Sequence, residues 1–264
     1  MRMCFRSGAT AGAVALATTG GAFAVAAVIA LVTHGTRDVT AHSAWPFAVA
    51  GFVAPGVSQL LFVRAIELIG ASRTAVLVGI APLVSTAFAL VLLNEPLRAG
   101  LVGGTVAIVG GGLLLAWEGE RSRVRTLGLV VAAIAAVAIA ARDNFVRWAA
   151  KANELPGTTA AALSLAAASM MLLVLFGRGE TAPLRSEWRA VAASALLLGL
   201  AYAFLLEALD RGRVTVVTPL YATESLWAVL FAWALLRRSE AVGRRLVAAA
   251  LLMVAGGVLI GISR

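Results

Sequence analysis

Long apolar runs separated by short charged breaks make up nearly the whole sequence. A helix needs about 20 apolar residues to cross the hydrocarbon core of a bilayer, so runs of this length predict membrane-spanning helices. We expect nine spans, at residues 8–33, 45–67, 74–94, 99–117, 126–148, 156–177, 190–209, 214–236 and 246–262. The predicted fold class is therefore an all-α polytopic membrane protein, with the lipid bilayer as its surroundings.

One hairpin of apolar runs occurs twice. Residues 74–117 contain Pro82, an Asn-Glu-Pro-Leu break and a glycine-rich second run, and residues 214–262 repeat this order with Pro219 and an Arg-Arg-Ser-Glu break. We therefore expect two repeats, 1–118 with four helices and 119–264 with five. Setting Glu95 against Glu240 without gaps aligns Leu101/Leu246, Val102/Val247, Val109/Val254, Gly111/Gly256, Gly112/Gly257 and Leu114/Leu259.

The composition agrees with a membrane protein. Apolar residues make up 61% of the chain and charged residues 13%, whereas a soluble domain has about 25% charged residues. A net charge of +9 would suggest nucleic acid in a soluble protein. Most of the basic residues here are arginines in the breaks, where such residues anchor and orient the spans. We expect no nucleic-acid partner.

The sequence offers no metal or cofactor site. Cys4 is the single cysteine, which excludes an internal disulfide and a thiolate metal cluster. His34 and His42 lie in what we predict to be one polar loop, and no third residue of a ligand type stands at metal spacing. We expect neither a metal nor a cofactor.

Glu224 is the most informative single residue. It lies about ten residues into the run 214–236, near the bilayer centre, where an ionised side chain costs at least a few kcal/mol. Two interpretations stay open: a carboxyl group that couples transport to protons, or a protonated glutamate that is hydrogen-bonded to a neighbouring helix. Several polar and aromatic residues within three turns could line the same cavity, namely Thr218, Tyr221, Thr223 and Trp227.

Prolines interrupt matching positions of the two hairpins. Pro82 and Pro219 each lie in the first run, where a proline frees a backbone carbonyl one turn earlier. Corresponding interruptions in two repeats point to a binding site between them, and a purely structural kink is the alternative. Pro55 and Gly56 predict a further kink within 45–67, and Gln59 follows on the same helix.

Charged residues near other span ends complete the candidate pathway. Arg64 and Glu67 are three residues apart, and we expect them to pair at the membrane interface. The helix of the fifth run either ends before Arg142 or continues, in which case Asp143 and Arg147 become i,i+4 partners. The candidate substrate and proton pathway comprises Gln59, Arg64, Pro82, Asp143, Asn144, Tyr202, Glu207, Thr218, Pro219, Tyr221, Thr223, Glu224 and Trp227.

Several of these motifs together resemble the EamA-type repeat of the drug/metabolite transporter superfamily. In the first half the likeness is carried by residues 61–92, with Ala65, Gly70-Ala71 and Pro82, then Asn94-Glu95-Pro96 and a glycine-rich last helix. In the second half it is carried by Ala208-Leu209, Thr223-Glu224-Ser225-Leu226 and Glu240. The resemblance covers most of residues 45–117 and 126–262.

The resemblance implies ten helices in two inverted five-helix repeats around a central cavity that opens alternately to either side. It implies a multi-pass protein of the cell (inner or plasma) membrane that exports small-molecule substrates such as metabolites, amino acids or drugs. Protons are the expected coupling ion. Whether the protein forms a homodimer is left open. Only four spans precede the midpoint, so we expect either a nine-helix variant or a reading frame that extends upstream and encodes another apolar span.

Two features of the sequence predict opposite orientations of the chain in the membrane. Basic residues are in excess in the breaks on the side of the N-terminus, and the positive-inside rule then places the N-terminus in the cytoplasm. The family topology without its first helix predicts the reverse. We favour the family topology, because the charge excess is modest and inverted repeats dilute it.

Three classes of function compete. The leading hypothesis is a secondary transporter driven by the proton gradient, since no phosphate-binding loop for ATP is present. An intramembrane enzyme would need a nucleophile–base pair or a metal motif at depth, and the sequence has no HExxH, no GxSxG and no histidine inside a predicted span. An inactive or truncated relative that acts as a membrane scaffold is the remaining alternative.

Overall fold

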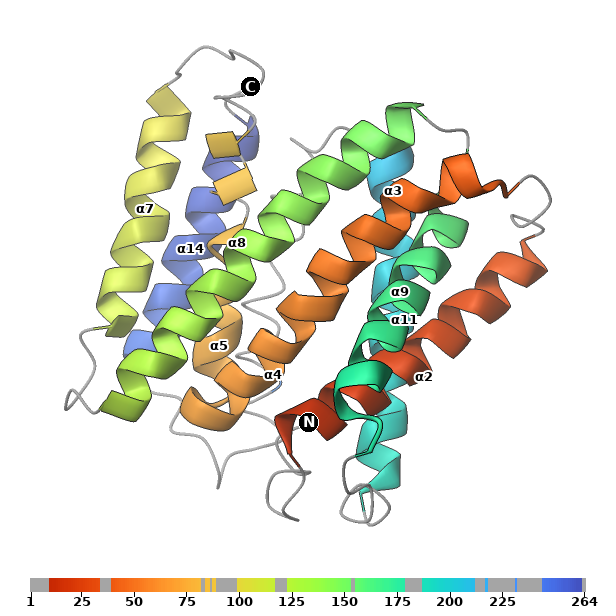
Figure 1. Cartoon of the computed structure of the whole chain (residues 1–264). Helices are drawn as coiled ribbons and strands as arrows, with labels where there is room; N and C mark the ends of the chain where they lie inside the picture. Colours follow the sequence, from red (N-terminus) through yellow and green to blue (C-terminus); the bar gives the residue numbers. More distant parts are fainter. Residues whose placement is uncertain are drawn as a thin grey trace. The chain divides into compact units, whose positions relative to one another are not determined.

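The computed structural model describes residues 10–33, 39–81, 84–85, 87–88, 99–116, 123–152, 155–178, 187–211, 217, 231 and 244–262. Every element whose bounds are described is a helix (Figure 1), in agreement with the predicted all-α class. Five segments within these residues are long and apolar enough to cross a membrane. They are Ala11–Val32, Ala41–Ile69, Thr126–Ala152, Gly157–Phe176 and Trp188–Arg211.

Three of these segments are single helices that match predicted runs. Helix α2 is Ala11–Val32, α9 is Gly157–Phe176 and α11 is Trp188–Arg211. Their bounds lie within a few residues of the predicted runs 8–33, 156–177 and 190–209. Run length therefore located these helices correctly, because most of each helix is apolar and none contains a proline.

The extent of helix α8 shows whether the fifth helix ends before Arg142 or continues beyond it. Helix α8 extends from Arg123 to Ala152 without a break, so the helix continues through Arg142, Asp143 and Asn144. A helix of 30 residues is about 45 Å long, more than the hydrocarbon thickness of about 30 Å. The three residues lie within the candidate span Thr126–Ala152 and not at its end.

The remaining helices are α5 (Ala71–Val78), α7 (Ala99–Ala116) and α14 (Arg244–Ile262). The last two match the predicted runs 99–117 and 246–262, and α5 lies at the start of the run 74–94. Beyond Ala81 that run is described only at 84–85 and 87–88, and the run 214–236 only at Val217 and Phe231. The count of nine spans therefore stays a prediction.

A break divides the span Ala41–Ile69. Helix α3 (Ala41–Gly51) is followed by the π-helical segment η1 (Phe52–Val57) and by α4 (Ser58–Ile69). Within η1, Ala54 has φ −147° and ψ 120°, an extended conformation. Pro55 explains it, because proline lacks the backbone N–H and disfavours a helical conformation in the residue before it. The predicted kink at Pro55 and Gly56 is confirmed.

The expectation that His42 lies in a polar loop is wrong. His42 is an exposed residue in the first turn of α3. Thr40 and Ser43 start the helix earlier than the apolar run suggests, because they form a reciprocal cap: the Ser43 N–H donates to Thr40 Oγ1 at 3.2 Å, and the Thr40 N–H donates to Ser43 Oγ at 3.1 Å. Such a cap satisfies backbone donors that a helix start otherwise leaves unpaired.

The chain forms two compact units. The first combines Met1–Val63 with Arg142–Gly212, and the second combines Arg64–Ala141 with Arg213–Arg264. Each unit takes helices from both predicted repeats, and α4 and α8 each contribute to both. The repeats 1–118 and 119–264 themselves stay a prediction.

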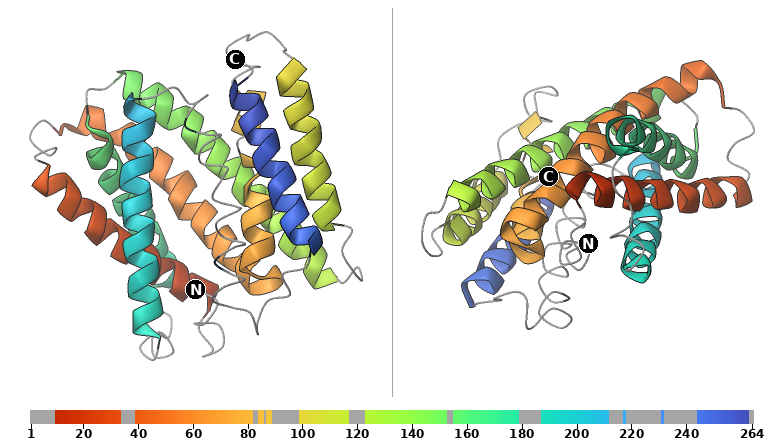
Figure 2. Two further views of the ribbon diagram at one scale, coloured as in Figure 1. Left: turned by 180° about the vertical axis from the view of Figure 1, so that it is seen from behind. Right: turned by 60° about the horizontal axis from the view of Figure 1, so that its bottom comes forward.

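Helix α9 is the centre of the first unit. It packs against α2, α3, η1 and α11, and it lies beside α11 in Figures 1 and 2. Small residues allow this close approach: a Cβ atom on Gly51 would lie 2.1 Å from the backbone oxygen of Ser164. The Ser164 hydroxyl also donates to the Phe47 carbonyl at 2.9 Å. Helices in lipid associate through such packing and interhelical hydrogen bonds.

Helices α7 and α14 run side by side in the second unit (Figures 1 and 2). A Cβ atom on Gly111 would lie 2.8 Å from the Ala249 carbonyl oxygen, and one on Gly256 would lie 2.6 Å from the Gly104 carbonyl oxygen. Gly111 and Gly256 are a pair that the gap-free alignment sets against each other. Gly111 allows α7 to approach the backbone of α14, and Gly256 allows α14 to approach the backbone of α7. The core around them contains Ala65, Ile69, Leu77, Ile108, Ala132, Ala249, Ala250 and Met253.

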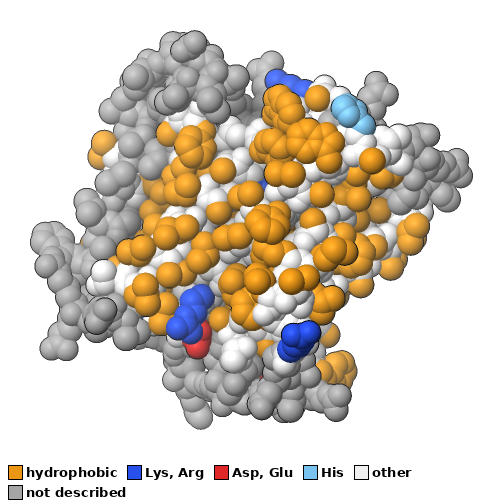
Figure 3. Space-filling view, viewed as in Figure 1, with side chains coloured by type: hydrophobic (Ala, Val, Ile, Leu, Met, Phe, Trp, Pro, Cys, Tyr) orange, Lys and Arg blue, Asp and Glu red, His pale blue; other side chains and the backbone are white. Residues whose placement is uncertain are grey.

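The described surface is that of a protein in lipid. Hydrophobic side chains cover most of the described area in Figure 3, and Lys, Arg, Asp and Glu side chains are few on it. On the lipid-crossing helices, Met170, Val174 and Phe204 are 69%, 80% and 71% exposed. Apolar side chains carry no hydrophobic penalty against lipid tails, which are as apolar as they are.

We expect Gly51→Ala to destabilise the protein, with Gly20→Ala as the matched control. Both replacements gain helix propensity of about 1 kcal/mol, but only the first drives a methyl group into the backbone of α9, and nothing lies within 4 Å of a Cβ atom on Gly20. Overpacking costs about 1–3 kcal/mol. Thermal melting in detergent should show a lower midpoint for Gly51→Ala than for Gly20→Ala. Equal midpoints would contradict the close approach of α3 and α9.

Candidate functional site

A charged pair lies buried in the first unit. Arg142 and Asp143 of α8 are 2% and 3% exposed, and Arg142 Nε lies 2.9 Å from Asp143 Oδ1. An isolated charge in such surroundings is strongly disfavoured, whereas opposite charges in contact offset part of the cost of removing both from water. The opposite charges of the two side chains therefore offset part of each other's cost of burial.

Tyr202 of α11 covers this pair from a second helix. The guanidinium carbon of Arg142 lies 5.0 Å from the centroid of the Tyr202 ring, and Tyr202 is 9% exposed. A cation over an aromatic face is attracted by up to about 2 kcal/mol when water is excluded. The structure thus brings together Asp143 and Tyr202, two predicted pathway residues, through Arg142.

The pair lies deep in its span. Arg142 is about ten residues from the end of α8 at Ala152, and at 1.5 Å per residue this is about 15 Å. The pair therefore lies inside the apolar span Thr126–Ala152, away from both of its ends. Ionisable residues at this depth face a bundle interior or a wet cavity and mark substrate or ion pathways.

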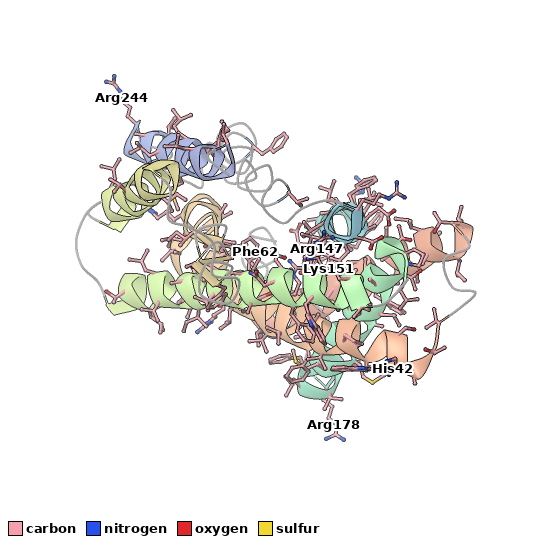
Figure 4. All side chains as sticks on the ribbon, turned by 90° about the horizontal axis from the view of Figure 1, so that it is seen from above. His42, Phe62, Arg147, Lys151, Arg178 and Arg244 are labelled. Atoms are coloured by element: carbon pink, nitrogen blue, oxygen red, sulfur yellow. The ribbon has the colours of Figure 1, made fainter. Side chains whose placement is uncertain are left out.

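A second polar group ties α8 to the end of α11. Arg147 Nη1 donates to the carbonyl oxygens of Leu209 and Asp210 at 2.9 and 3.0 Å. The last carbonyls of a helix lack partners within the helix and carry partial negative charge, so a cation is favoured there. Figure 4 shows Arg147 and Lys151, one turn apart, on the side of α8 that is turned toward α11.

Glu207 ties the same end of α11 to the start of α9. Its Oε2 accepts a hydrogen bond from the Thr158 N–H at 3.2 Å, and its carboxylate also pairs with Arg211. The first N–H groups of a helix are unpaired and favour an anion. Arg147 and Glu207 therefore join three helices by placing a cation at one helix end and an anion at another.

The other predicted residues lie elsewhere. Gln59 is 7% exposed on α4, directly after the break at η1, and its Nε2 atom has no hydrogen-bond partner in the described part of the chain. Asn144 is half-buried next to Asp143. Arg64 forms the predicted pair with Glu67, in the second unit. Outside the described residues lie Pro82, Thr218, Pro219, Tyr221, Thr223, Glu224 and Trp227.

The predicted pairing of Asp143 with Arg147 is wrong. Asp143 pairs with its neighbour Arg142, and Arg147 instead donates to α11. The rule that pairs charged residues at positions i and i+4 considers only the surface of an isolated helix. It takes no account of the end of α11, whose carbonyl oxygens occupy Arg147.

Arg142 is the residue that sequence reasoning left out of the pathway. A signal for it exists: two opposite charges stand next to each other inside a mostly apolar span, so each can offset the charge of the other. A long arginine side chain can fold back along its helix, which allows a contact between adjacent residues that Cβ directions alone do not favour.

The model of the EamA-like transporter family matches residues 2–117 and 126–262. The chain belongs to the EamA-like transporter family. It is therefore a multi-pass membrane protein of a family of small-molecule transporters, consistent with the drug/metabolite transporter superfamily that the sequence resembles. Among curated proteins none matches the chain. A solved crystal structure of a protein shares the fold, with a TM-score of 0.70, 21% identity, and coverage of 95% of this chain and 88% of the other.

We expect Arg147→Gln to loosen the contact between α8 and α11. The replacement removes two charge-assisted hydrogen bonds to carbonyl oxygens, each of which contributes about 1.5–3 kcal/mol in favourable cases. Lys151→Gln is the matched control, since Lys151 lies one turn further on α8 and is exposed. Hydrogen exchange of the last turn of α11 should accelerate in Arg147→Gln and stay unchanged in Lys151→Gln. Unchanged exchange in both would contradict the bridging role of Arg147.

Proposed function

We propose that this EamA-like protein is a secondary transporter that exports small organic solutes across the cell membrane by alternating access, with transport coupled to protons. Membership in a transporter family supports the general function. The observation that carries the finer proposal is the buried Arg142–Asp143 pair inside the span Thr126–Ala152. A transporter that couples to protons needs an ionisable group at such a depth.

The proposed architecture is a pair of inverted repeats around a central cavity. Two stretches of the chain, 2–117 and 126–262, match one family model, and this supports duplication of one bundle. Gly111 and Gly256, which the alignment pairs, make equivalent close approaches to a neighbouring helix. Inverted repeats allow one binding site to open alternately to the two sides by movement of one bundle against the other.

The proposed pathway adds residues from several helices to the buried pair. Glu224 is the second candidate for proton binding, because the run 214–236 places it near mid-membrane. Gln59 contributes an amide donor beside a helix break, and such breaks line binding sites in transporters. The candidate residues after Thr218 and the kink at Pro82 are assigned to the same pathway on sequence position alone.

We expect proteoliposomes with an imposed pH gradient to show solute movement that Glu224→Gln reduces. The amide cannot bind a proton, so movement that depends on the gradient should fall by at least about tenfold, equivalent to about 1.4 kcal/mol. Glu187→Gln is the control, since Glu187 precedes the span of α11. Flux should be followed by mass spectrometry of the external medium after loading with a cell metabolite extract. Flux that responds neither to the gradient nor to Glu224→Gln would refute proton coupling through Glu224.

A further inference from the structure

Two buried polar groups of the first unit have no hydrogen-bond partner within the described residues. They are the hydroxyl group of Thr19 on α2 and the Nε2 atom of Gln59 on α4. Thr19 is 0% exposed and Gln59 is 7% exposed, so bulk water does not reach either group in this conformation. A buried polar group without a partner destabilises the conformation that contains it, because its hydrogen bonds to water are lost without replacement.

Both groups border one apolar cluster, which α2, α4 and α9 form together. Ala15, one turn before Thr19, and Val63, one turn after Gln59, belong to this cluster, and Leu172 of α9 completes the contact of the three helices. Residues four apart lie on the same face of a helix. The two unpaired groups therefore lie on the helix faces that meet at the cluster.

Met171 of α9 is the adaptable side chain at this place. It packs against the same cluster, and its Cε atom would lie 3.0 Å from a Cβ atom on Gly56. Methionine is unbranched and repacks easily, since it has three rotatable bonds. Gly56 belongs to η1, where Pro55 interrupts the helical hydrogen bonds of the second span. The cluster thus adjoins the least regular part of the described helices of the first unit.

Thr18 provides an internal comparison for Thr19. Both are 0% exposed on α2, but the Thr18 hydroxyl donates to the Val14 carbonyl at 2.8 Å. A threonine in a helix commonly satisfies its hydroxyl group in this way. The Thr19 hydroxyl makes no such bond within the described residues. It therefore differs from its neighbour in the partner of its hydroxyl group and not in its burial.

We propose that Thr19 and Gln59 form a hydration switch in the first unit. In a second conformation, Met171 moves aside, and water enters between α2, α4 and α9 and hydrogen-bonds to both groups. The unpaired groups raise the free energy of the closed conformation, in which both are buried, and so keep the second conformation populated. The inference rests on the proposed alternating access, to which it adds one place where the first unit opens.

Apolar replacements should shift this equilibrium in one direction. Valine has the shape of threonine without the hydroxyl group, and leucine replaces the glutamine amide by methyl groups. Each replacement removes an unpaired group from the closed conformation and a hydrogen bond to water from the second one. Both effects favour the closed conformation, so its population rises.

The first test compares adjacent threonines by thermal melting in detergent. Thr19→Val should raise the midpoint by about 2–4 °C, because it removes an unpaired group. Thr18→Val should not raise it, because it removes a hydroxyl group that is already satisfied. A midpoint for Thr19→Val no higher than that for Thr18→Val would overturn the switch, whether or not the protein transports a solute.

The second test measures how often water reaches the cluster. Ala15→Cys places a thiol at a position that is 0% exposed, in a chain whose single native cysteine is removed by Cys4→Ser. A small water-soluble methanethiosulfonate reacts with the thiolate form, so labelling follows the population of the open conformation. Adding Thr19→Val and Gln59→Leu should slow labelling at least about tenfold, equivalent to about 1.4 kcal/mol.

Thr18→Val, added to the same chain, is the matched control and should leave the labelling rate unchanged. Equal labelling rates with and without Thr19→Val and Gln59→Leu would refute the switch. Solute flux in proteoliposomes tests the proposed transport separately. Absence of flux in the wild type would contradict transport, while melting and labelling still decide the switch.

Discussion

The low dielectric of a membrane helix bundle is the constraint on which the arrangement of the first unit depends. Arg142 and Asp143 are almost fully shielded from solvent, so contact between their opposite charges offsets part of the cost of burying both. Neutralisation requires both residues to lie at one depth, which adjacent positions on an unbroken α8 provide. It also brings the Tyr202 ring of α11 against the guanidinium. One electrostatic requirement thus couples two helices.

The same constraint governs the helix ends. Backbone groups in the first and last turns have no partners within their helix, and lipid offers none. Arg147 supplies donors to the end of α11, and Glu207 supplies an acceptor to the start of α9. These two side chains hold α8, α9 and α11 together at one end, while the glycine contacts of α9 with α3 bring the backbones together further along.

In this small-molecule transporter, the contacts that hold the helices together are distinct from the buried ion pair. Interhelical hydrogen bonds and glycine contacts determine where the helices lie. The Arg142–Asp143 pair, by contrast, is a buried pair of ionisable groups inside a span, and such groups face a bundle interior or a wet cavity. Gln59 lies directly after the kinked segment η1, and its Nε2 atom has no hydrogen-bond partner in the described part of the chain.

Much of the fold was predictable because its causes are local. The length of an apolar run determined α2, α9 and α11, and the missing N–H of Pro55 determined the break in the second span, so the sequence alone was sufficient for these. The contacts of Arg147 with the end of α11 and of Glu207 with the start of α9 were decided only by the tertiary structure. A flexible charged side chain can reach several groups on its own helix or on others, and the choice depends on which helix ends and aromatic faces lie within a few ångströms. Sequence spacing carries no information about those neighbours. It assigned Arg147 to Asp143, although the carbonyl oxygens at the end of α11 bind Arg147 and the adjacent Arg142 contacts Asp143.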